Sequence, residues 1–379
     1  MTVVGTRPEI IRLSRTLARL DQHFDHVLVH TGQNYDYKLS QVFFEELALR
    51  PPDRYLGVDT SSLGRMLGGT LAAVEEAILE VRPHAMLVLG DTNSSIAAVM
   101  AKRLQVPVYH MEAGNRCFDE NVPEEVNRRL VDHVADFNLV YTEHARRNLL
   151  AEGLPTRRIA LTGSPMAEVL AYYRAAIEAA NPLTGLGLVE DGFFLVSAHR
   201  EENVDEPDRL GRLVETLRDV RAEWGLPVVI STHPRTRRRL EEAGLGDEAE
   251  IVFHEPFGFL DYVHLQTKAR CVLSDSGTIS EESAILGFPA VTLRNAIERP
   301  EALEAGTIVS AVIDSAAVRS AIRQVLDQNK RGDIGSGPAE YRMLDCSRRA
   351  VNFMRSTMDS HHEWAGIRRR SGVWSRPQP

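Results

Sequence analysis

The sequence predicts an α/β protein made of two doubly wound parallel-sheet domains that face a cleft. Three observations support this prediction. Short apolar runs alternate with helical patterns along the chain, the alternation pauses near residues 166–187 and restarts, and notable polar residues follow the apolar runs. Strands that alternate with helices form parallel sheets with helices on both faces. Ligands of such sheets bind outside the carboxyl ends of the strands.

The first half of the chain contains six apolar runs with the length of short strands. The run at residues 1–5 is followed by a helical pattern over 8–20, and longer helical patterns cover 65–81 and 94–104. The five further strand candidates are residues 26–32, 85–91, 106–111, 136–142 and 159–163. We therefore expect a first domain over residues 1–165.

A second α/β series follows a break that is rich in Pro and Gly. Residues 166–180 have the pattern of one helix, and residues 181–187 supply the break. The next five strand candidates are residues 192–200, 226–234, 250–256, 269–277 and 289–294. This series predicts a second domain over 166–344, and the polar segment 366–379 is expected to be a loose tail.

The composition is that of a globular protein and narrows the range of partners. The chain has 379 residues, 43% of them hydrophobic and 26% charged, and this length suits two domains. A net charge of −9 argues against nucleic acid or an anionic membrane as the main partner. The three cysteines lack the paired spacing of a zinc site, and no apolar run is long enough to span a membrane. We expect a cytoplasmic protein without a metal.

The turn in "VVGTRPEII" is the first candidate anion site. Pro8 and Glu9 open a helix directly after a strand, and the free N–H groups and helix dipole at such a start favour an anion. Arg7 adds a guanidinium suited to phosphate oxygens. A tight turn with Arg7 on the surface explains the pattern equally well. The fingerprint GxGxxG is absent after this strand and after "FFLVS", which argues against tightly bound NAD.

Two further strand ends carry hydroxyl residues and carboxylates. In "SDSGTISEES", Ser276, Gly277 and Thr278 form a small turn whose amides suit a diphosphate. Glu282, one turn later, suits the hydroxyls of a ribose. In "LVLGDTNSS", Asp91 is either a functional carboxylate or the cap of the next helix.

Two histidines follow strands of the second series, each with a basic residue nearby. They are His199 in "SAHREEN" and His233 in "STHPR". Such a pair fits a wall that faces phosphate, although a single histidine at a strand end is more often structural. Their spacing matches no metal-binding pair. Arg299, in "ERPEALEAGT", belongs either to the same site or to a charged surface loop.

The stretch "HMEAGNRCFDENVPEEVNRRL" concentrates charge where a predicted strand ends. It places five carboxylates, Glu112 and Glu124 among them, beside three arginines. Glu124 and Arg128 are four residues apart on a predicted helix and therefore share a face. An exposed, salt-bridged helix start is the alternative, and Glu112 at the strand end favours a functional site.

Nine motifs of the chain resemble those of the non-hydrolysing UDP-N-acetylglucosamine 2-epimerases, in the same order over about residues 1–310. They are "GTRPE", "TGQNYD", "GDTNS", "HMEAGNR", "PEEVNRR", "SAHREEN", "STHPR", "DSGTISEE" and "ERPEALEAGT". The resemblance implies two Rossmann-like domains in the glycosyltransferase-B arrangement, with a helix at about 345–365 packing back onto the first domain. It also implies an isomerase that acts on a UDP-sugar, uses no cofactor and forms a homodimer.

The resemblance further implies roles for single residues. Asp91, Glu112 and Glu124 would be acid/base carboxylates near C2 of the sugar, with His199 also in the catalytic set. The residues expected to bind UDP or the sugar are Arg7, Arg12, Arg128, His233, Ser276, Gly277, Thr278, Glu282 and Arg299.

Several residues depart from the pattern of the family's UDP-N-acetylglucosamine enzymes. "EAGLR" reads "EAGNR", "GHRRE" reads "AHREE", and Arg12 stands where lysine is usual. These variants resemble the branch that converts UDP-2-acetamido-2,6-dideoxy-L-talose to UDP-N-acetyl-L-fucosamine. A UDP-N-acetylglucosamine 2-epimerase is the alternative, followed by a glycosyltransferase of the same fold, a hydrolysing epimerase and a nucleotide-sugar sensor. The effector motif of the family also differs, because "TGQH" reads "TGQNYD".

Overall fold

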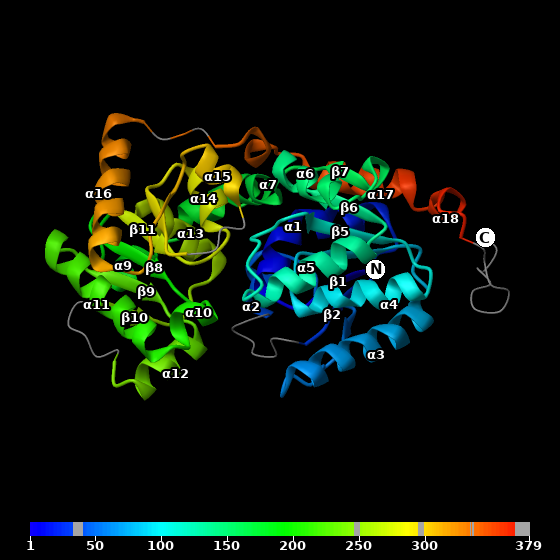
Figure 1. Ribbon diagram of the computed structural model, residues 1–379, viewed down its shortest axis with the longest axis horizontal. Coiled ribbons are helices and arrows are strands. Elements are labelled where there is room, and N and C mark those ends of the chain that lie inside the picture. The colour runs from blue at the N-terminus through cyan, green and yellow to red at the C-terminus, as the bar shows by residue number, and fades with distance from the viewer. Residues whose placement is uncertain (33–40, 246–250, 295–298, 334, 336, 368–379) are drawn as a thin grey trace.

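The computed structural model describes residues 1–32, 41–245, 251–294, 299–333, 335 and 337–367. Within them the chain forms two parallel sheets, each covered by helices on both faces (Figure 1). The predicted fold class, two α/β domains, is confirmed. No helix in these ranges is long and apolar enough to span a membrane.

The first sheet reverses its winding direction between β1 and β4. In the described ranges it has seven strands, in the order β3-β2-β1-β4-β5-β6-β7. They are β1 (Thr2–Val4), β2 (Leu28–His30), β3 (Arg54–Tyr55), β4 (Met86–Leu89), β5 (Val108–Ala113), β6 (Phe137–Val140) and β7 (Ile159–Leu161). A crevice forms outside the carboxyl ends of the strands at such a reversal, so Arg7 and Asp91 follow strands that flank it.

Helices cover the first sheet on both faces and leave two apolar cores. One face carries α1 (Arg7–His23), α2 (Gln41–Glu46), α7 (Pro165–Tyr172) and α17 (Cys346–Thr357). The opposite face carries α3 (Leu63–Val81), α4 (Ala97–Arg103) and α5 (Pro123–Val134). Near the sheet edge lie α6 (Glu143–Ala151) and the 3-10 turn η3 (Thr156–Arg158), and η2 (Asn93–Ile96) precedes α4.

Helix α1 begins where the sequence predicts a helix start. Pro8 lies in its first turn, and Glu9 closes a capping box by accepting hydrogen bonds from the N–H of Thr6 at 2.8 Å and of Gly5 at 3.0 Å. The Glu9 carboxylate also accepts a hydrogen bond from Ser94 at 2.5 Å. It therefore holds the turn after β1 against the turn after β4.

The second sheet repeats the same plan. Among the described residues it has six strands, in the order β10-β9-β8-β11-β12-β13. They are β8 (Phe194–Ser197), β9 (Val228–Ser231), β10 (Ile251–His254), β11 (Cys271–Ser274), β12 (Ala290–Thr292) and β13 (Val309–Ser310). Its direction reverses between β8 and β11, the strands that precede His199 and Ser276. The two reversal points, one in each sheet, are thus marked by predicted site residues.

Two helix pairs sandwich the second sheet. One face carries α11 (Pro207–Trp224) and α16 (Ser315–Arg331), and the other carries α13 (Phe259–Lys268) and α14 (Ile279–Leu286). The remaining helical segments are α8 (Arg174–Ala179), α9 (Pro182–Leu186), α10 (Glu201–Val204), α12 (Pro234–Glu242), α15 (Pro300–Glu304) and the 3-10 turn η4 (Ala339–Arg342).

The last helices lie on the first domain. Helix α17 packs against α1 and α7, and α18 (His361–Trp364) follows it (Figure 1). The hydroxyl of Tyr109 on β5 lies 2.6 Å from that of Thr357, and Arg19 Nε donates to Ser347 Oγ at 3.0 Å. The chain thus returns to the domain in which it began.

Two points of the sequence analysis need correction. Residues 166–180 are two helices, not one, because Tyr173 has left the α region at φ −89°, ψ 6° and ends α7 before α8 begins. The edge strands β3 and β13 were not predicted, because each has only two residues, too few to show an alternation of apolar and polar side chains. The expectation for "TGQNYD" falls largely on residues 33–36, which lie outside the described ranges.

Candidate active site

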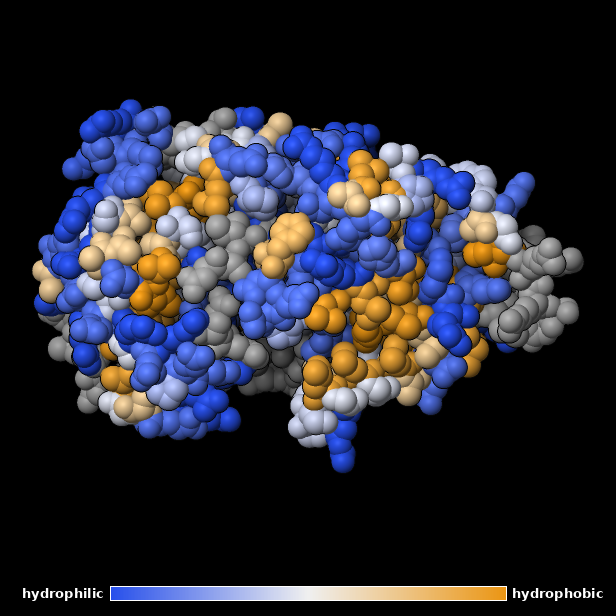
Figure 2. Space-filling model, in the orientation of Figure 1, coloured by the Kyte–Doolittle hydropathy of each residue, from blue (hydrophilic) through white to orange (hydrophobic). Residues whose placement is uncertain are grey.

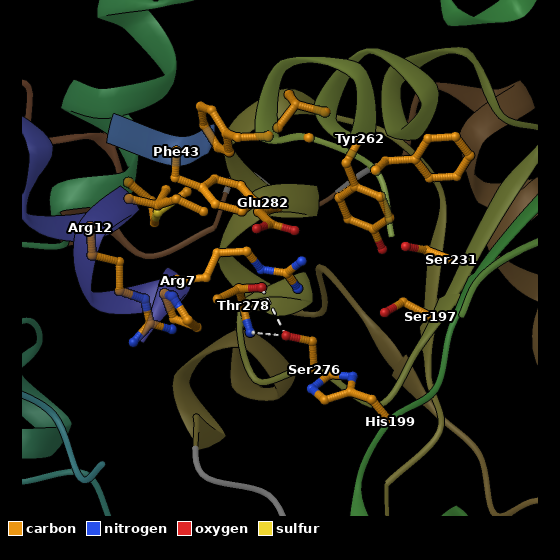
Figure 3. Close-up of a pocket in the computed structure, with 17 residues that line it drawn as sticks. Arg7, Arg12, Phe43, Ser197, His199, Ser231, Tyr262, Ser276, Thr278 and Glu282 are labelled. Carbon is orange, nitrogen blue, oxygen red and sulfur yellow. Dashed lines mark hydrogen bonds between the residues drawn. The ribbon is translucent and has the colours of Figure 1, made fainter. Parts of the chain in front are cut away.

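An open cavity of about 780 Å³ lies between the two domains (Figure 3). Its walls come from α1 and α2 of the first domain and from β8, β9, α13 and α14 with their adjoining turns of the second. Six predicted site residues line it: Arg7, Arg12, His199, Ser276, Thr278 and Glu282.

Arg7 is the main cation that points into this cavity from the first domain (Figure 3). It is the first residue of α1, and its guanidinium lies 5.5 Å from the ring centre of Phe43. Burial lowers the pKa of Arg7, while Tyr262, Glu282 and Glu46 act in the opposite direction. A half-desolvated guanidinium at a helix start is a strong anion site.

The facing wall is the hydroxyl-rich turn between β11 and α14. Ser276 Oγ lies 3.0 Å from Thr278 Oγ1, and the Ser276 N–H is satisfied by Ser274 Oγ at 3.0 Å. Helix α14 begins directly after Thr278, so its first amides face the same side. This arrangement provides hydroxyl and amide donors for phosphate oxygens, with Gly277 between them.

His199 is held at the cavity by Asp275. The carboxylate of Asp275 is fully buried and accepts hydrogen bonds at 3.0 Å from the N–H of His199, the N–H of Arg200 and the amide of Asn203. The ring of His199 is 42% exposed, and its Nδ1 lies 3.2 Å from Asp275. Burial raises the pKa of Asp275, but the charge and hydrogen bonds of His199 and its neighbours outweigh this and lower it to about 2.

Glu282 is a buried carboxylate at the cavity wall. It accepts a hydrogen bond from Gln266 Nε2 at 2.6 Å, and burial raises its pKa. A carboxylate in this setting can accept hydrogen bonds from vicinal hydroxyls of a ligand.

Glu112 lies at the centre of the most unusual backbone in the site. It has a φ of 65°, a left-handed conformation that a non-glycine residue adopts at a cost of about 1–3 kcal/mol. The register between β5 and β6 shifts at this position. A Cβ on Gly90, just before Asp91, would lie 3.5 Å from Glu112 Oε2, so the two carboxylate-bearing loops are neighbours. Such strain is typical of functional sites.

Two arginines from different domains hold the Glu112 carboxylate. Arg12 of α1 pairs with Oε2, and Arg299 Nη2 donates to Oε1 at 2.8 Å. Arg299 is buried and the side chain of Arg12 is 11% exposed; nearby carboxylates more than offset the effect of desolvation, so that the pKa of each arginine is raised. Arg299 therefore joins the two domains at the carboxylate that the sequence singled out.

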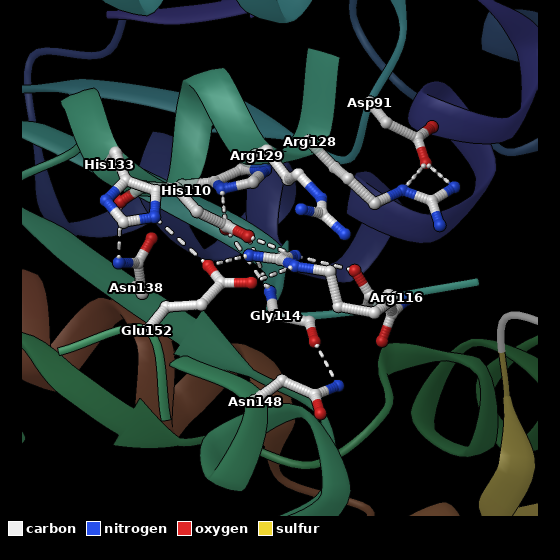
Figure 4. A network of polar contacts seen from close by, with 12 residues as sticks. Asp91, His110, Gly114, Arg116, Arg128, Arg129, His133, Asn138, Asn148 and Glu152 are labelled. Carbon is white, nitrogen blue, oxygen red and sulfur yellow. Dashed lines mark hydrogen bonds and ion pairs between the residues drawn. The ribbon is translucent and has the colours of Figure 1, made fainter. Parts of the chain in front are cut away.

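Asp91 forms a separate pair beside this cluster. Its Oδ2 accepts hydrogen bonds from Arg128 Nη2 at 2.6 Å and Nε at 3.0 Å, and Arg128 also contacts Glu125 at 3.2 Å (Figure 4). Glu124 and Arg128 both lie on α5, as expected, and Arg128 pairs with Glu125 of the same helix. Glu124 is half-buried in the first turn of α5 and has no hydrogen-bond partner among the described residues. The cavity lining does not include Asp91, Glu124 or Arg128.

A buried network fixes the end of β5 from behind (Figure 4). Asp132, with no exposed surface, accepts hydrogen bonds from Arg116 at 2.7 Å and from the N–H of Gly114 at 3.1 Å, and lies 2.9 Å from His110. Arg116 continues to Glu152 at 2.7 Å. Part of the charge in residues 110–130 therefore serves structure rather than chemistry.

His233 does not join the cavity wall. It is the N-cap of α12, where its ring accepts a hydrogen bond from the N–H of Arg235 at 3.3 Å. Burial, together with nearby His199, Arg7 and Arg235, lowers the pKa of His233 to about 4. Its ring is therefore neutral at pH 7 and is committed to the cap.

Sequence reasoning missed the aromatic and supporting parts of the site. The missed cavity residues include Phe43, Phe257, Phe259 and Tyr262, together with Ser197 and Ser231. The signal for Ser197 and Ser231 was present, since both end strands at the same edge as His199. No local pattern distinguishes the aromatic residues from ordinary core. Among the described residues, no group of His, Cys, Asp and Glu could hold a metal.

Comparison with known proteins agrees with this geometry. The family model described as UDP-N-acetylglucosamine 2-epimerase matches residues 18–355. The chain belongs to the UDP-N-acetylglucosamine 2-epimerase family. It is therefore an isomerase, as the motifs predicted.

Individual relatives cover nearly the whole chain. The UDP-N-acetylglucosamine 2-epimerase of Methanocaldococcus jannaschii is 35% identical over 353 residues, 90% of this chain and 96% of that protein. The UDP-2,3-diacetamido-2,3-dideoxy-D-glucuronate 2-epimerase of Pseudomonas aeruginosa is 38% identical over 314 residues, 82% of this chain and 87% of that protein.

Solved structures of the family share the fold. The Rickettsia bellii UDP-N-acetylglucosamine 2-epimerase superposes with a TM-score of 0.90 at 40% identity and covers 97% of this chain and 99% of that one. The Methanocaldococcus jannaschii enzyme in complex with UDP-GlcNAc and UDP gives a TM-score of 0.87 at 32% identity and covers 94% and 99%.

Proposed function

We propose that this protein is a non-hydrolysing C2-epimerase of a UDP-2-acetamido sugar. One observation carries the proposal. Arg7 and the turn of Ser276 and Thr278 face each other across one cavity, and Arg12 in the same wall pairs with the strained Glu112. A site for a diphosphate leaving group thus lies beside a carboxylate that can move a proton. The membership of the family and the UDP-GlcNAc and UDP complex of a relative support the assignment of the ligand.

The chemistry explains why both parts are needed. C2 of a 2-acetamido sugar is not adjacent to a carbonyl carbon, so its proton is too weakly acidic for direct removal. Breaking the anomeric C1–O bond expels UDP, and loss of the C2 proton leaves a glycal. Protonation on the opposite face of C2 and re-addition of UDP at C1 complete the inversion.

The residues take their roles from this sequence of steps. We assign Arg7, His199 and the Ser276–Thr278 turn, including Gly277, to the diphosphate, where they stabilise the departing charge. Glu282 is assigned to the ribose. The proton transfers at C2 are assigned to the carboxylates Asp91, Glu112 and Glu124, two of which are held by arginines.

The remaining arginines support these carboxylates from the sugar side. We assign Arg12 and Arg299 to the Glu112 side of the sugar and Arg128 to the Asp91 side. His233 is assigned a structural role as a cap.

We infer that the preferred substrate is UDP-2-acetamido-2,6-dideoxy-L-talose, which would give UDP-N-acetyl-L-fucosamine. The supporting observations are "EAGNR", "AHREE" and Arg12, the positions at which the chain departs from the pattern of the UDP-N-acetylglucosamine enzymes. UDP-N-acetylglucosamine is the second candidate, because the names of several relatives point to it.

Product formation with matched sugars tests this choice. The purified protein is incubated separately with the 6-deoxy-L-talo sugar, UDP-N-acetylglucosamine and UDP-2,3-diacetamido-2,3-dideoxy-D-glucuronate, and the anomeric protons are followed by NMR. We expect the highest kcat/KM with the first sugar. A higher value with either of the others would overturn the substrate assignment. UDP release that requires an added acceptor would instead indicate a glycosyltransferase.

We also propose a homodimer formed through the outer helices of the first domain. Apolar side chains gather over α3, α4 and α5 (Figure 2), and Leu63, Leu79 and Val126 are among the exposed ones. Light scattering after gel filtration should give twice the chain mass. Leu63→Glu together with Leu79→Glu should give the monomer mass, and an unchanged mass would exclude this surface.

A further inference from the structure

Arg299 reaches from the second domain to a carboxylate of the first. It precedes α15, and its guanidinium, 4% exposed, donates to Glu112 Oε1 at 2.8 Å. The guanidinium carbon also lies 6.0 Å from the ring centre of Tyr141. The position of Arg299 therefore decides where the Glu112 carboxylate lies once the domains meet.

Glu281 holds Arg299 from the other side. It lies on α14 with no exposed side-chain surface, and its Oε1 is 2.5 Å from Arg299 Nη1. Neither carboxylate oxygen of Glu281 has a hydrogen bond of normal geometry among the described residues. A buried carboxylate is stable only when it is paired, so the ion pair with Arg299 is what stabilises the Glu281 carboxylate in the interior.

Four side chains with little exposed surface form a balanced charge cluster. Arg12 and Arg299 supply two positive charges, and Glu112 and Glu281 supply two negative ones. Each arginine pairs with Glu112, but only Arg299 pairs with Glu281. Loss of the Glu281 charge would leave Arg299 free to share its full charge with Glu112 and to move toward it.

Other ionisable groups around the cluster are the hydroxyls of Tyr141 and Tyr341 and the carboxylates of Glu282 and Glu301. Burial raises the pKa of each of these four groups. Glu301 accepts a hydrogen bond from Tyr341 at 2.8 Å, and the charge of Arg299 lowers its pKa, against the effect of burial. It is a buried acid of the same region that makes no ion pair with Arg299 in the described structure.

We propose that Glu281 is a positioning residue for the epimerisation. It fixes Arg299 at the domain boundary and so sets the place and the proton affinity of the Glu112 carboxylate. This inference rests on the proposed function, because it requires Glu112 to transfer the C2 proton. A purely structural ion pair is the competing explanation, and it predicts a change in stability alone.

The test compares Glu281→Gln with Glu301→Gln in the full-length protein. For each variant, exchange of the C2 hydrogen in D2O gives kcat and KM as a function of pH, and UDP binding and thermal unfolding are measured alongside. We expect Glu281→Gln to lower kcat by about 10–100-fold, the scale of misplacing a reacting group by about 1 Å. UDP affinity should stay within about threefold, as Arg7 and the Ser276–Thr278 turn are unchanged.

The pH profile separates positioning from simple stability. Removal of one negative charge favours the ionised form of Glu112, so the acid limb of kcat/KM should move to lower pH in Glu281→Gln. Glu301→Gln should lower the unfolding temperature and move this limb less than Glu281→Gln does, because Glu301 acts on Arg299 without an ion pair among the described residues. Glu281→Asp keeps the charge but withdraws it by one methylene, so it should give an intermediate kcat with the acid limb of the wild type.

The outcomes are distinct. A kcat for Glu281→Gln within twofold of the wild type, or a reduced kcat with an unmoved acid limb, overturns the proposal. If Glu281→Gln does not fold, a wild-type kcat in Glu281→Asp overturns it. Absence of exchange in the wild-type protein overturns the proposed function and this inference with it, whereas exchange that Glu281→Gln leaves untouched overturns only the inference.

Discussion

Replacement of Asp275 by Asn removes the charge around which the His199 turn is built. Asn keeps the shape of the side chain but behaves as the neutral form of the carboxyl. The pKa of Asp275 falls from its ordinary value of 3.8 to about 2, and each pKa unit corresponds to about 1.4 kcal/mol, so ionisation stabilises the fold by about 2–3 kcal/mol. We expect Asp275→Asn to lose about this much.

Thermal unfolding measures this loss. In a domain of about 150–250 residues, 1 kcal/mol corresponds to about 2–4 °C, so the unfolding temperature should fall by about 4–12 °C at pH 7. The control is Asp327→Asn, an exposed carboxylate of the second domain paired with Arg331, which should shift it by less than about 2 °C. Turnover should fall as well, since His199 loses its support.

The pH dependence supplies the decisive part of this test. The folded-state pKa of Asp275 lies below the unfolded one, so its stabilisation is present above about pH 4 and is lost as the pH falls through about 2. The difference between wild type and Asp275→Asn should therefore be constant from pH 7 to pH 5 and narrow below pH 4. Equal unfolding temperatures at pH 7 would refute the reasoning.

Three further changes test other parts of the account. Gly114→Ala should destabilise the first domain by about 2–5 kcal/mol in thermal unfolding, because its Cβ would lie 2.4 Å from the Ala145 carbonyl oxygen at a φ of 82°. The control Gly153→Ala has a similar backbone strain but open space around the new Cβ, so it should lose only about 1–2 kcal/mol, and equal losses would contradict this. Glu46→Ala should open the cleft and so give a larger particle in small-angle scattering. The Glu46 carboxylate of the first domain accepts hydrogen bonds from the N–H groups of Phe259 at 2.9 Å and Leu260 at 2.6 Å, at the start of α13. The control Glu45→Ala, at an exposed neighbouring residue, should leave the particle size unchanged. His233→Asn should retain the cap, and its stability should fall less than that of the wild type as the pH falls from 6.5 to about 4. The reason is that the pKa of His233 is lowered in the folded protein, so the unfolded chain takes up the proton first. Parallel curves of stability against pH, measured by chemical denaturation, would disprove this.

Most of the fold could be predicted from the sequence, because parallel strands that are buried on both faces appear as short, near-continuous apolar runs. The two strands missed, β3 and β13, have two residues each at sheet edges, too few for a pattern. The break at Tyr173 was missed because no Pro or Gly marks it.

Only part of the candidate site could be predicted from the sequence. Residues at strand ends share one edge of a sheet, so His199 and the Ser276–Thr278 turn could be placed together. The pairing of Glu112 with Arg299 could not be predicted, because 187 residues separate the two and they meet only when the domains dock. Glu281 and Asp275 resemble ordinary helix-start and turn residues in sequence, and only burial and distance reveal what they support.

The most direct test of the central claim is proton NMR of the protein with a UDP-2-acetamido sugar in D2O. Elimination to a glycal requires that the C2 hydrogen leaves and that a solvent deuteron replaces it. We expect loss of the C2 proton signal while the sugar remains linked to UDP, in both C2 epimers, and a rate at least about 100-fold lower in Glu112→Gln. Epimers that form with the C2 hydrogen fully retained, or no exchange with any of the three sugars, would contradict the elimination mechanism.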